Sequence, residues 1–352
     1  MATVTVLASA PVTGISEANA LNNAGTVVGQ DDTVFPFLWQ PAQPNGTTGT
    51  LTRLPVLPTG PMAGEATAMS INNNGVVAGF SAGLDAQGNA VTRAVVWIGG
   101  TVQDLGTLIP DLTNPGSFLG SSKAIDINDA GQVVGRSDTI FGSEHAFLFD
   151  PAVGVMRDLG ALIPISMVPA TPDPSRATSI NNLGDIVGVS AALDKNGNVV
   201  ERAFLLPAGA VFMIDLGTLI ADPNNPGGFL ETSGAFGIND HGKIIGTSDA
   251  GIGPSGSMLT GAVEFANGAA PTALLPMQSD GYDIGPGDHV VGSFNLPSEG
   301  FVSHATTGMV MLTGLAATSG MTIVGGTGVN SSGQLTALAD VGGSPVGVLI
   351  TP

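Results

Sequence analysis

The side chains best suited to acid–base chemistry are four groups in one short stretch and one carboxyl far along the chain. Asp126, Asp138, Glu144 and His145 lie close together in the sequence, and Asp283 holds in a later repeat the place that Asp126 holds in its own. General acid–base catalysis needs two such groups that converge in one site, with their pKa values shifted to suit different roles. These five residues are therefore the candidates for a catalytic pair.

Two arginines and a polar connection offer candidate ligand contacts. Arg93 and Arg202 stand where His145 stands in its own repeat, and Asp222 and Asn225 lie in a connection rich in Asn and Pro. The place of His145 also varies to Phe or Gly in other repeats. Such free variation favours a structural role, in which the His or Arg caps a loop or pairs with an Asp.

Metal-binding patterns are sparse. Asp222 and Asp249 are the candidate oxygen ligands for a metal ion. Segments 85–89 and 194–198 superficially resemble a calcium loop, but they lack the alternating carboxylates and closing Glu of an EF-hand, which favours hairpin turns. Cysteine is absent, which excludes disulfides and Cys-ligated zinc. We expect no cofactor, and calcium remains the open alternative.

The elements that must position these residues are repeated copies of one unit. Its signature is an Ile-Asn pair, a short turn that ends in Gly, and a β-branched pair followed by a second Gly, a pattern typical of a tight hairpin. The spacing of the copies matches that of propeller blades. Seven copies occur, the last two weaker, at residues 21–29, 71–79, 127–135, 180–188, 238–246, 284–292 and 329–337.

Each copy continues into a short apolar run and then a final segment, which predicts four strands per unit. The predicted fourth strands lie at residues 52–57, 103–108, 157–162, 214–219, 272–277 and 311–315. The seventh unit lacks a fourth strand, whereas the chain begins with an unpartnered strand at residues 3–8. The sequence therefore predicts one all-β domain over 1–352, almost without helix. It is a seven-bladed β-propeller of four-stranded antiparallel blades, and its ring is closed by the N-terminal strand pairing into the last blade.

The connections predict which face carries a site. Those between second and third strands, and between fourth and first strands, are mostly long, and in a propeller both lie on one face. Just before each Ile-Asn pair stands a small or short residue, which predicts crowding at the axis, with Asp126 and Asp283 as the candidates to touch a channel ligand. The recurrent motif Asn and the Asp of the Asp-Leu-Gly segments are predicted to bond backbone groups in turns.

Composition limits the partners. The net charge is -19 with only nine Lys and Arg residues, so nucleic acid and anionic membranes are not expected to bind. The sequence contains no apolar run long enough to span a membrane, so membrane insertion is not expected. A cation, a saccharide or a basic protein suits this charge better, although acidity also serves solubility. Residues 1–3 do not begin a signal peptide, so either the protein is cytoplasmic or it is extracellular and its signal has been removed.

The segments INDAGQVVG, HAFLF and RDLGAL, at residues 127–135, 145–149 and 157–162, resemble the HAF repeat of bacteria, named for its His-Ala-Phe, here 145–147. The resemblance covers most of the chain and is clearest in the second to fifth units. That family is regarded as extracellular and has no characterised function. The resemblance therefore implies a secreted repeat protein and supplies no catalytic residues.

Three functions follow as hypotheses. The first is a secreted binding or structural scaffold that uses the long-loop face to hold an extracellular protein, a saccharide or another copy of itself. The second is an enzyme, a hydrolase or lyase acting on an extracellular polysaccharide or other polymer, with acidic residues in the axial funnel. A perturbed carboxylate pair there would favour the enzyme. The third is a calcium-stabilised adhesin.

Overall fold

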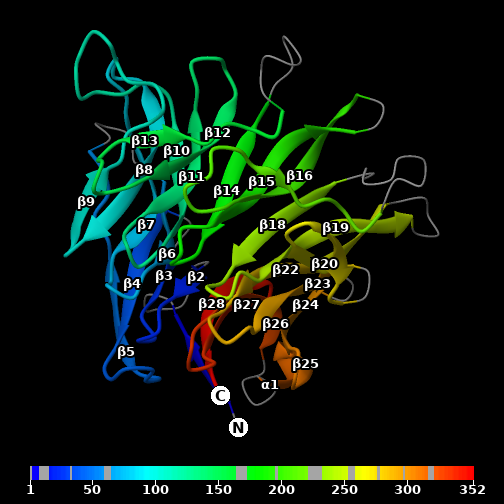
Figure 1. Cartoon of the computed structure of the whole chain (residues 1–352). Coiled ribbons are helices and arrows are strands. Elements are labelled where there is room, and N and C mark those ends of the chain that lie inside the picture. Colours follow the sequence, from blue (N-terminus) through cyan, green and yellow to red (C-terminus); the bar gives the residue numbers. More distant parts are fainter. Residues whose placement is uncertain are drawn as a thin grey trace.

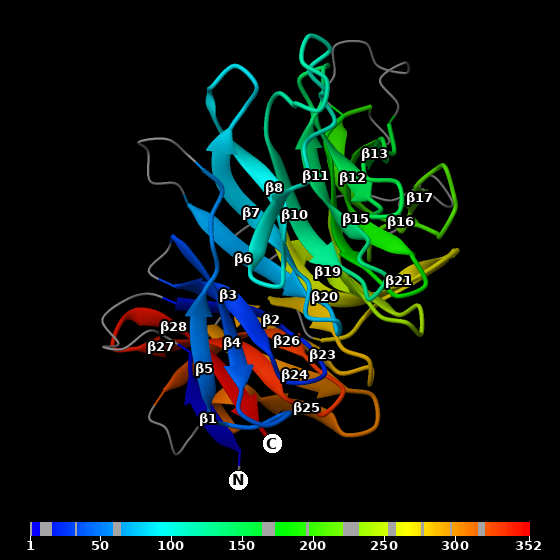
Figure 2. The same cartoon turned by 90° about the vertical axis from the view of Figure 1, so that its left-hand side faces the viewer.

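The computed structural model describes residues 2–7, 16–31, 34–58, 65–163, 173–194, 197–220, 232–252, 258–275, 278–295, 298–315 and 321–352. It contains seven four-stranded antiparallel sheets that succeed one another around a ring, a seven-bladed β-propeller as predicted (Figures 1 and 2). In every blade the strands are ordered from the axis outward, and the inner strands of neighbouring blades contact each other.

The first three blades are built as follows, each from its innermost strand. Blade 1 contains β2 (Ser16–Leu21), β3 (Val27–Asp31), β4 (Phe35–Pro41) and β5 (Gly49–Arg53); blade 2 contains β6 (Ala66–Ile71), β7 (Val77–Leu84), β8 (Ala90–Ile98) and β9 (Thr101–Asp104); blade 3 contains β10 (Ser122–Ile127), β11 (Val133–Asp138), β12 (Glu144–Phe149) and β13 (Met156–Asp158).

The next three blades have the same order. Blade 4 contains β14 (Ser175–Ile180), β15 (Ile186–Leu193), β16 (Val199–Leu206) and β17 (Ile214–Asp215); blade 5 contains β18 (Ser233–Ile238), β19 (Ile244–Ile252), β20 (Met258–Ala266) and β21 (Ala269–Ala273); blade 6 contains β22 (Ser279–Ile284), β23 (Val290–Asn295), β24 (Ser298–His304) and β25 (Gly308–Met311), followed by the short helix α1 (Leu312–Leu315).

Blade 7 closes the ring and confirms the predicted closure. It consists of β26 (Thr322–Val329), β27 (Leu335–Val341), β28 (Ser344–Thr351) and, on its outer edge, the N-terminal β1 (Thr3–Val6). Because β1 pairs antiparallel with β28, the two chain ends lie side by side (Figure 1). Leu7 follows β1 into the core and is almost fully buried. Pairing of the first and last strands leaves no open break in the ring.

Both parts of the repeated signature, the turn that begins with Asn and the second glycine, have a physical reason. In blade 3 the Asn128 side-chain oxygen accepts the backbone N–H of Gln132, and Gly131 takes a positive φ of 79°, which closes the turn. The second glycine, Gly135, faces the bulged inner strand, where a Cβ would overlap the carbonyl oxygen of Lys123. Only glycine permits this close approach between the two innermost strands.

The motif asparagines also join the blades into a circular chain of hydrogen bonds, which we call the Asn belt. Each Asn donates its side-chain N–H to the backbone carbonyl of the equivalent residue in the next blade, as Asn72 does to Asn128 at 3.0 Å. The belt includes Asn22, Asn72, Asn128, Asn181, Asn239 and Asn330. Gly285 accepts from Asn239 but has no side chain to pass the bond on to blade 7. The predicted backbone-bonding role of these residues is confirmed.

Three sequence predictions differ in detail from the structure. In blades 2, 3 and 4 the fourth strand ends at the Asp of Asp-Leu-Gly instead of continuing past it, because Asp104 and its equivalents accept the N–H of a glycine with positive φ two residues later, as in Asp104 with Gly106 at 2.8 Å. In blade 1 the fourth strand is Gly49–Arg53 instead of 52–57. Residues 312–315, predicted as strand, form α1. Several long connections between second and third strands are partly strand: β7 and β8 extend until only a five-residue hairpin turn, 85–89, remains.

Candidate functional site

A cavity of about 420 Å³ lies on the ring axis and brings together the two carboxyls predicted to face the channel, Asp126 and Asp283. Its wall is formed by the inner strands of the blades. One layer of the wall is the layer of small or short residues that contains both carboxyls. The layer before it consists of Asn19, Met69, Ile125, Thr178, Phe236, Tyr282 and Thr327. A ring of aliphatic side chains, which includes Ile127 and Ile284, separates it from a second cavity of about 160 Å³ lined by the Asn belt.

The axial cavity belongs to the face that carries the long connections. The inner strands run toward the short hairpin turns of the Asn belt, so residues that precede the aliphatic ring lie on the opposite side, where the second-to-third and fourth-to-first connections are found. The prediction that a site would lie near the axis on this face therefore agrees with the position of the cavity.

Asp126 is fully engaged by the protein around it. One carboxylate oxygen accepts Ser70 Oγ at 2.7 Å and the N–H of Ile127 at 2.8 Å; the other accepts Ser179 Oγ at 3.0 Å and the N–H of Ile180 at 2.9 Å. Burial raises the pKa of Asp126, and these hydrogen bonds oppose that rise. Asp126 thus joins blades 2, 3 and 4 and has little capacity left for a ligand.

Asp283 has the same place in blade 6 but different neighbours. The equivalent residues of the adjacent blades are glycines, Gly237 and Gly328, which offer no hydroxyl. Its partners are the backbone N–H groups of Ile284, at 2.8 Å, and Val329. Burial, and then the charge of Asp126, raise the pKa of Asp283 to about 6. Asp283 is therefore the carboxyl of this pair with free capacity and with a pKa near the physiological range.

The other predicted catalytic residues lie on the second and third strands of blade 3 and do not line the axial cavity. His145 Nδ1 contacts Asp158 at 2.9 Å and its Nε2 lies 3.4 Å from Asp173, which precedes the inner strand of blade 4. Burial lowers the pKa of His145, but the two carboxylates outweigh that effect and raise it overall. His145 thus links blades 3 and 4 through its contacts with two carboxylates. Asp138 accepts the N–H of Ser121 at 2.7 Å. Glu144 pairs with Arg136 at 2.9 Å. The five catalytic candidates therefore form no single site.

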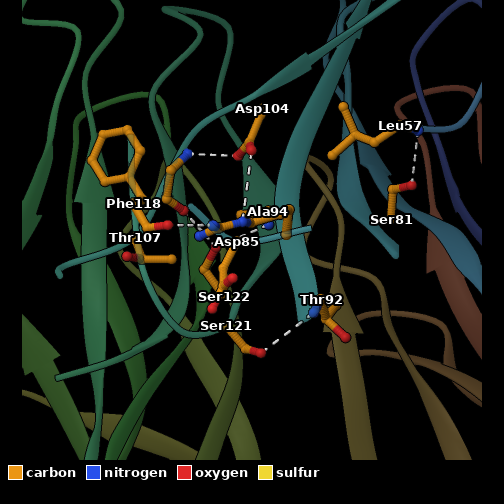
Figure 3. A network of polar contacts seen from close by, with 12 residues as sticks. Leu57, Ser81, Asp85, Thr92, Ala94, Asp104, Thr107, Phe118, Ser121 and Ser122 are labelled. Atoms are coloured by element: carbon orange, nitrogen blue, oxygen red, sulfur yellow. Dashed lines mark hydrogen bonds and ion pairs between the residues drawn. The ribbon is translucent and has the colours of Figure 1, made fainter. Parts of the chain in front are cut away.

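Arg93 and Arg202, predicted as ligand contacts, are buried equivalents of His145. Arg93 donates to the carbonyl of Phe118 at 2.8 Å and approaches Asp104 at 3.7 Å, and Arg202 approaches Asp215 at 4.0 Å. Figure 3 shows the surrounding bonds that join blade 2 to its neighbours, such as Ser121 Oγ accepting the N–H of Thr92. In all three blades, therefore, a basic side chain on the third strand meets the Asp of Asp-Leu-Gly.

Of the two metal-ligand candidates, Asp249 lies within the described residues and Asp222 does not. Asp249 accepts the N–H and the hydroxyl of Thr232 at 2.8 and 2.9 Å, a turn role like that of Asp138. Asp222 and Asn225 lie outside the described residues. Within the described part of the chain, no group of three or more His, Cys, Asp or Glu side chains is placed to hold a metal ion.

The sequence interpretation missed the residues that surround Asp283. Phe236 and Tyr282 line the cavity one position before the layer of small residues, beside Thr178 and Thr327. The aligned repeats could have indicated these residues. The position that Phe236 and Tyr282 occupy holds Asn19, Met69 and Ile125 in other repeats, so its chemistry varies, whereas the next position is always a small or short residue. Asp173 was also missed, since it lies between repeats and nothing in its spacing connects it with His145.

Comparisons with known proteins identify a family. The chain is similar in structure to virginiamycin B lyase from Staphylococcus aureus (11% identity, TM-score 0.46, all of both chains covered) and to a gluconolactonase from Xanthomonas campestris (11% identity, TM-score 0.41, 100% of this chain and 90% of that one). No curated protein sequence matches it. No helix in the described residues is long and apolar enough to cross a membrane. Residues 37–220, more than half of the chain, match the model of one family, so the chain belongs to the family described as "Protein of unknown function (DUF3466)".

Proposed function

We propose that this protein is a ligand-binding β-propeller whose site is the axial cavity on the long-loop face. One observation carries the proposal: Asp283, a carboxyl with a pKa of about 6, lines the axial cavity between two glycines that leave it without hydroxyl partners. A convergent polar group with a perturbed pKa in a cavity of this size is the usual mark of a binding site.

Binding explains the cavity better than catalysis by two carboxylates. Paired acid–base catalysis needs two carboxyls that can each reach a substrate. Asp126 accepts four hydrogen bonds from the protein, so its lone pairs are occupied, and Asp283 stands alone as a group free to contact a ligand. The extracellular location and the scaffold role remain predictions, as does stabilisation by calcium, which a thermal shift with calcium against chelator would measure.

The test uses a methionine that lines the cavity. Met69 faces the axial cavity, whereas Met156 lines an outer apolar groove of about 560 Å³ between blades 2 and 3. With ¹³C-methyl methionine, a mixture of small saccharides, alcohols, acids and amines should shift the Met69 signal and leave that of Met156 in place. Met69→Leu assigns the signal. If only Met156 responds, the axial site is wrong and the outer groove is the binding surface.

An enzyme acting on an extracellular polymer is the second candidate, and the raised pKa of Asp283 is the observation that favours it. In that case Asp283 would act as a single acid or base. The pH dependence of kcat/KM should then follow one ionisation near pH 6, and Asp283→Asn should abolish turnover. Turnover that survives Asp283→Asn would remove this candidate.

A further inference from the structure

We propose that the ligand of the axial cavity is an organic cation, a protonated amine whose nitrogen pairs with Asp283. This inference rests on the proposed function, because it assigns a chemical class to the ligand of the same cavity. It depends on three features of the cavity wall: the direction of its hydrogen bonds, its charge, and its aromatic side chains.

Four hydroxyl groups of the cavity wall have already donated their hydrogens. Thr178 Oγ donates to the carbonyl of Ala235 in the next blade at 2.7 Å, and Thr327 Oγ donates to that of Ala18 at 2.6 Å. Ser70 and Ser179 donate to Asp126. A hydroxyl has one hydrogen, so each of these four oxygens can only accept a further bond. The bonds that hold adjacent blades together thus turn the cavity wall into a surface of acceptors.

A surface of acceptors selects a ligand rich in donors. A primary ammonium group carries three N–H donors and no acceptor. A neutral saccharide would bring hydroxyl oxygens as well, and these would meet few side-chain donors. Few side-chain donors remain on the wall: one N–H of Asn19, whose other N–H goes to the carbonyl of Ala68, and the hydroxyl of Tyr282, which is paired with Ser293. A carboxylate or phosphate ligand is disfavoured for the same reason.

The charge of the wall points the same way. Its titratable side chains are Asp126, Asp283 and Tyr282, and the described lining contains no Lys, Arg or His. The raised pKa of Asp283 reports a carboxylate that lacks a compensating cation, which a bound ammonium would supply. A net charge of -19 also favours the approach of cations over long distances.

Two aromatic rings complete the fit. Phe236 and Tyr282, from adjacent blades 5 and 6, line the cavity, and aromatic faces attract organic cations. Calcium suits the wall less well. It takes six to eight oxygen ligands with several carboxylates, whereas Asp126 is already saturated and Asp283 is the one carboxyl left. An organic cation satisfies a single carboxylate and uses the apolar part of the wall as well.

The experiment compares probes that differ in charge and share a shape. Benzylammonium, benzyl alcohol and benzoate are titrated against the whole chain, as are 1-butylammonium and 1-butanol, while the methyl signals of Met69 and Met156 are followed. We expect both amines to shift Met69 with at least tenfold higher affinity than their alcohols, and benzoate to have no effect. Asp283→Asn should weaken amine binding at least tenfold, whereas Asp138→Asn, on the second strand of blade 3 and not part of the cavity lining, should leave it unchanged.

The pH dependence in the unaltered protein gives an independent measure should Asp283→Asn fail to fold. With a pKa of about 6, the ionised fraction of Asp283 falls about tenfold between pH 7 and pH 5, and amine affinity should fall with it. Equal binding of benzyl alcohol and benzylammonium at Met69 would overturn the cation assignment and leave the axial site intact. Silence of Met69 toward every probe, in this experiment and in the mixed screen, would overturn both proposals.

Discussion

Replacing Asp283 with Asn should make the protein relatively more stable at high pH. In the folded protein the pKa of Asp283 is about 6, against 3.8 for an ordinary Asp. The folded state therefore holds its proton more tightly than the unfolded state. The resulting stabilisation is fully present below about pH 3.8 and is lost as pH rises through 6. Complete loss corresponds to about 3 kcal/mol, an upper limit because part of the side chain faces the cavity.

Since the isoelectric point is near 4.1, the comparison is best made at pH 5 and pH 8. Between these values Asp283 should remove about 1.4 kcal/mol from the free energy of unfolding, and Asp283→Asn should escape that loss. Guanidinium unfolding followed by the fluorescence of the buried Trp39 and Trp97 measures the difference. Asp85→Asn is the control, because hydrogen bonds from Asn89 lower the pKa of Asp85 and both its states titrate below pH 5. An equal difference between Asp283→Asn and the unaltered protein at pH 5 and pH 8 would refute the assignment.

Three further substitutions test the supports of the ring. Asn128→Ala breaks the Asn belt at Asn181 and leaves buried backbone groups unpaired, so chemical unfolding should show a loss of about 2–3 kcal/mol. The raised pKa of His145 means that its pairing with Asp158 stabilises the fold below pH 6.5 and is lost as pH rises through the folded pKa; His145→Arg should therefore raise the melting temperature at pH 9 relative to the unaltered protein. Leu7→Ala, beside the closing strand, should cost about 2–4 kcal/mol and increase aggregation seen by light scattering.

The fold was predictable because its information is local and repeated. A strand pair and its turn are specified by residues within ten positions of each other, such as those from Ile127 to Gly135, and seven copies reinforce one interpretation. Even the closure followed from counting, since one strand was missing at the end and one was left over at the start. The fourth strands were predicted less well, because Asp104 and its equivalents bond two residues ahead and stop the strand within an otherwise extended pattern.

For the candidate site, the sequence could predict only which position of the repeat faces the axis. The aligned repeats place Asp126 and Asp283 in the same layer, and the cavity confirms that both face the axis. The repeats also suggested His145, whose partners Asp158 and Asp173 become visible only when blades 3 and 4 are side by side. A basic residue that recurs on the third strand reads equally well as a ligand contact or as a buried ion pair until the neighbouring blade is in place.

What separates the two axial carboxyls is the chemistry of other blades. Ser70 and Ser179 lie more than fifty residues from Asp126 on either side, yet they flank it in the ring and occupy its oxygens. Gly237 and Gly328 take those places beside Asp283 and leave it open. A substitution of Gly237 by Ser would test whether a neighbouring hydroxyl alone makes the difference, although a Cβ there would lie 3.1 Å from the backbone nitrogen of Ile284. If the added hydroxyl bonds Asp283, the pKa of that carboxyl should fall and amine affinity at Met69 should fall too, because the hydroxyl takes up acceptor capacity that the amine would use. In this ring the proposed ligand site is the place where the side-chain hydrogen bonding between blades is left incomplete.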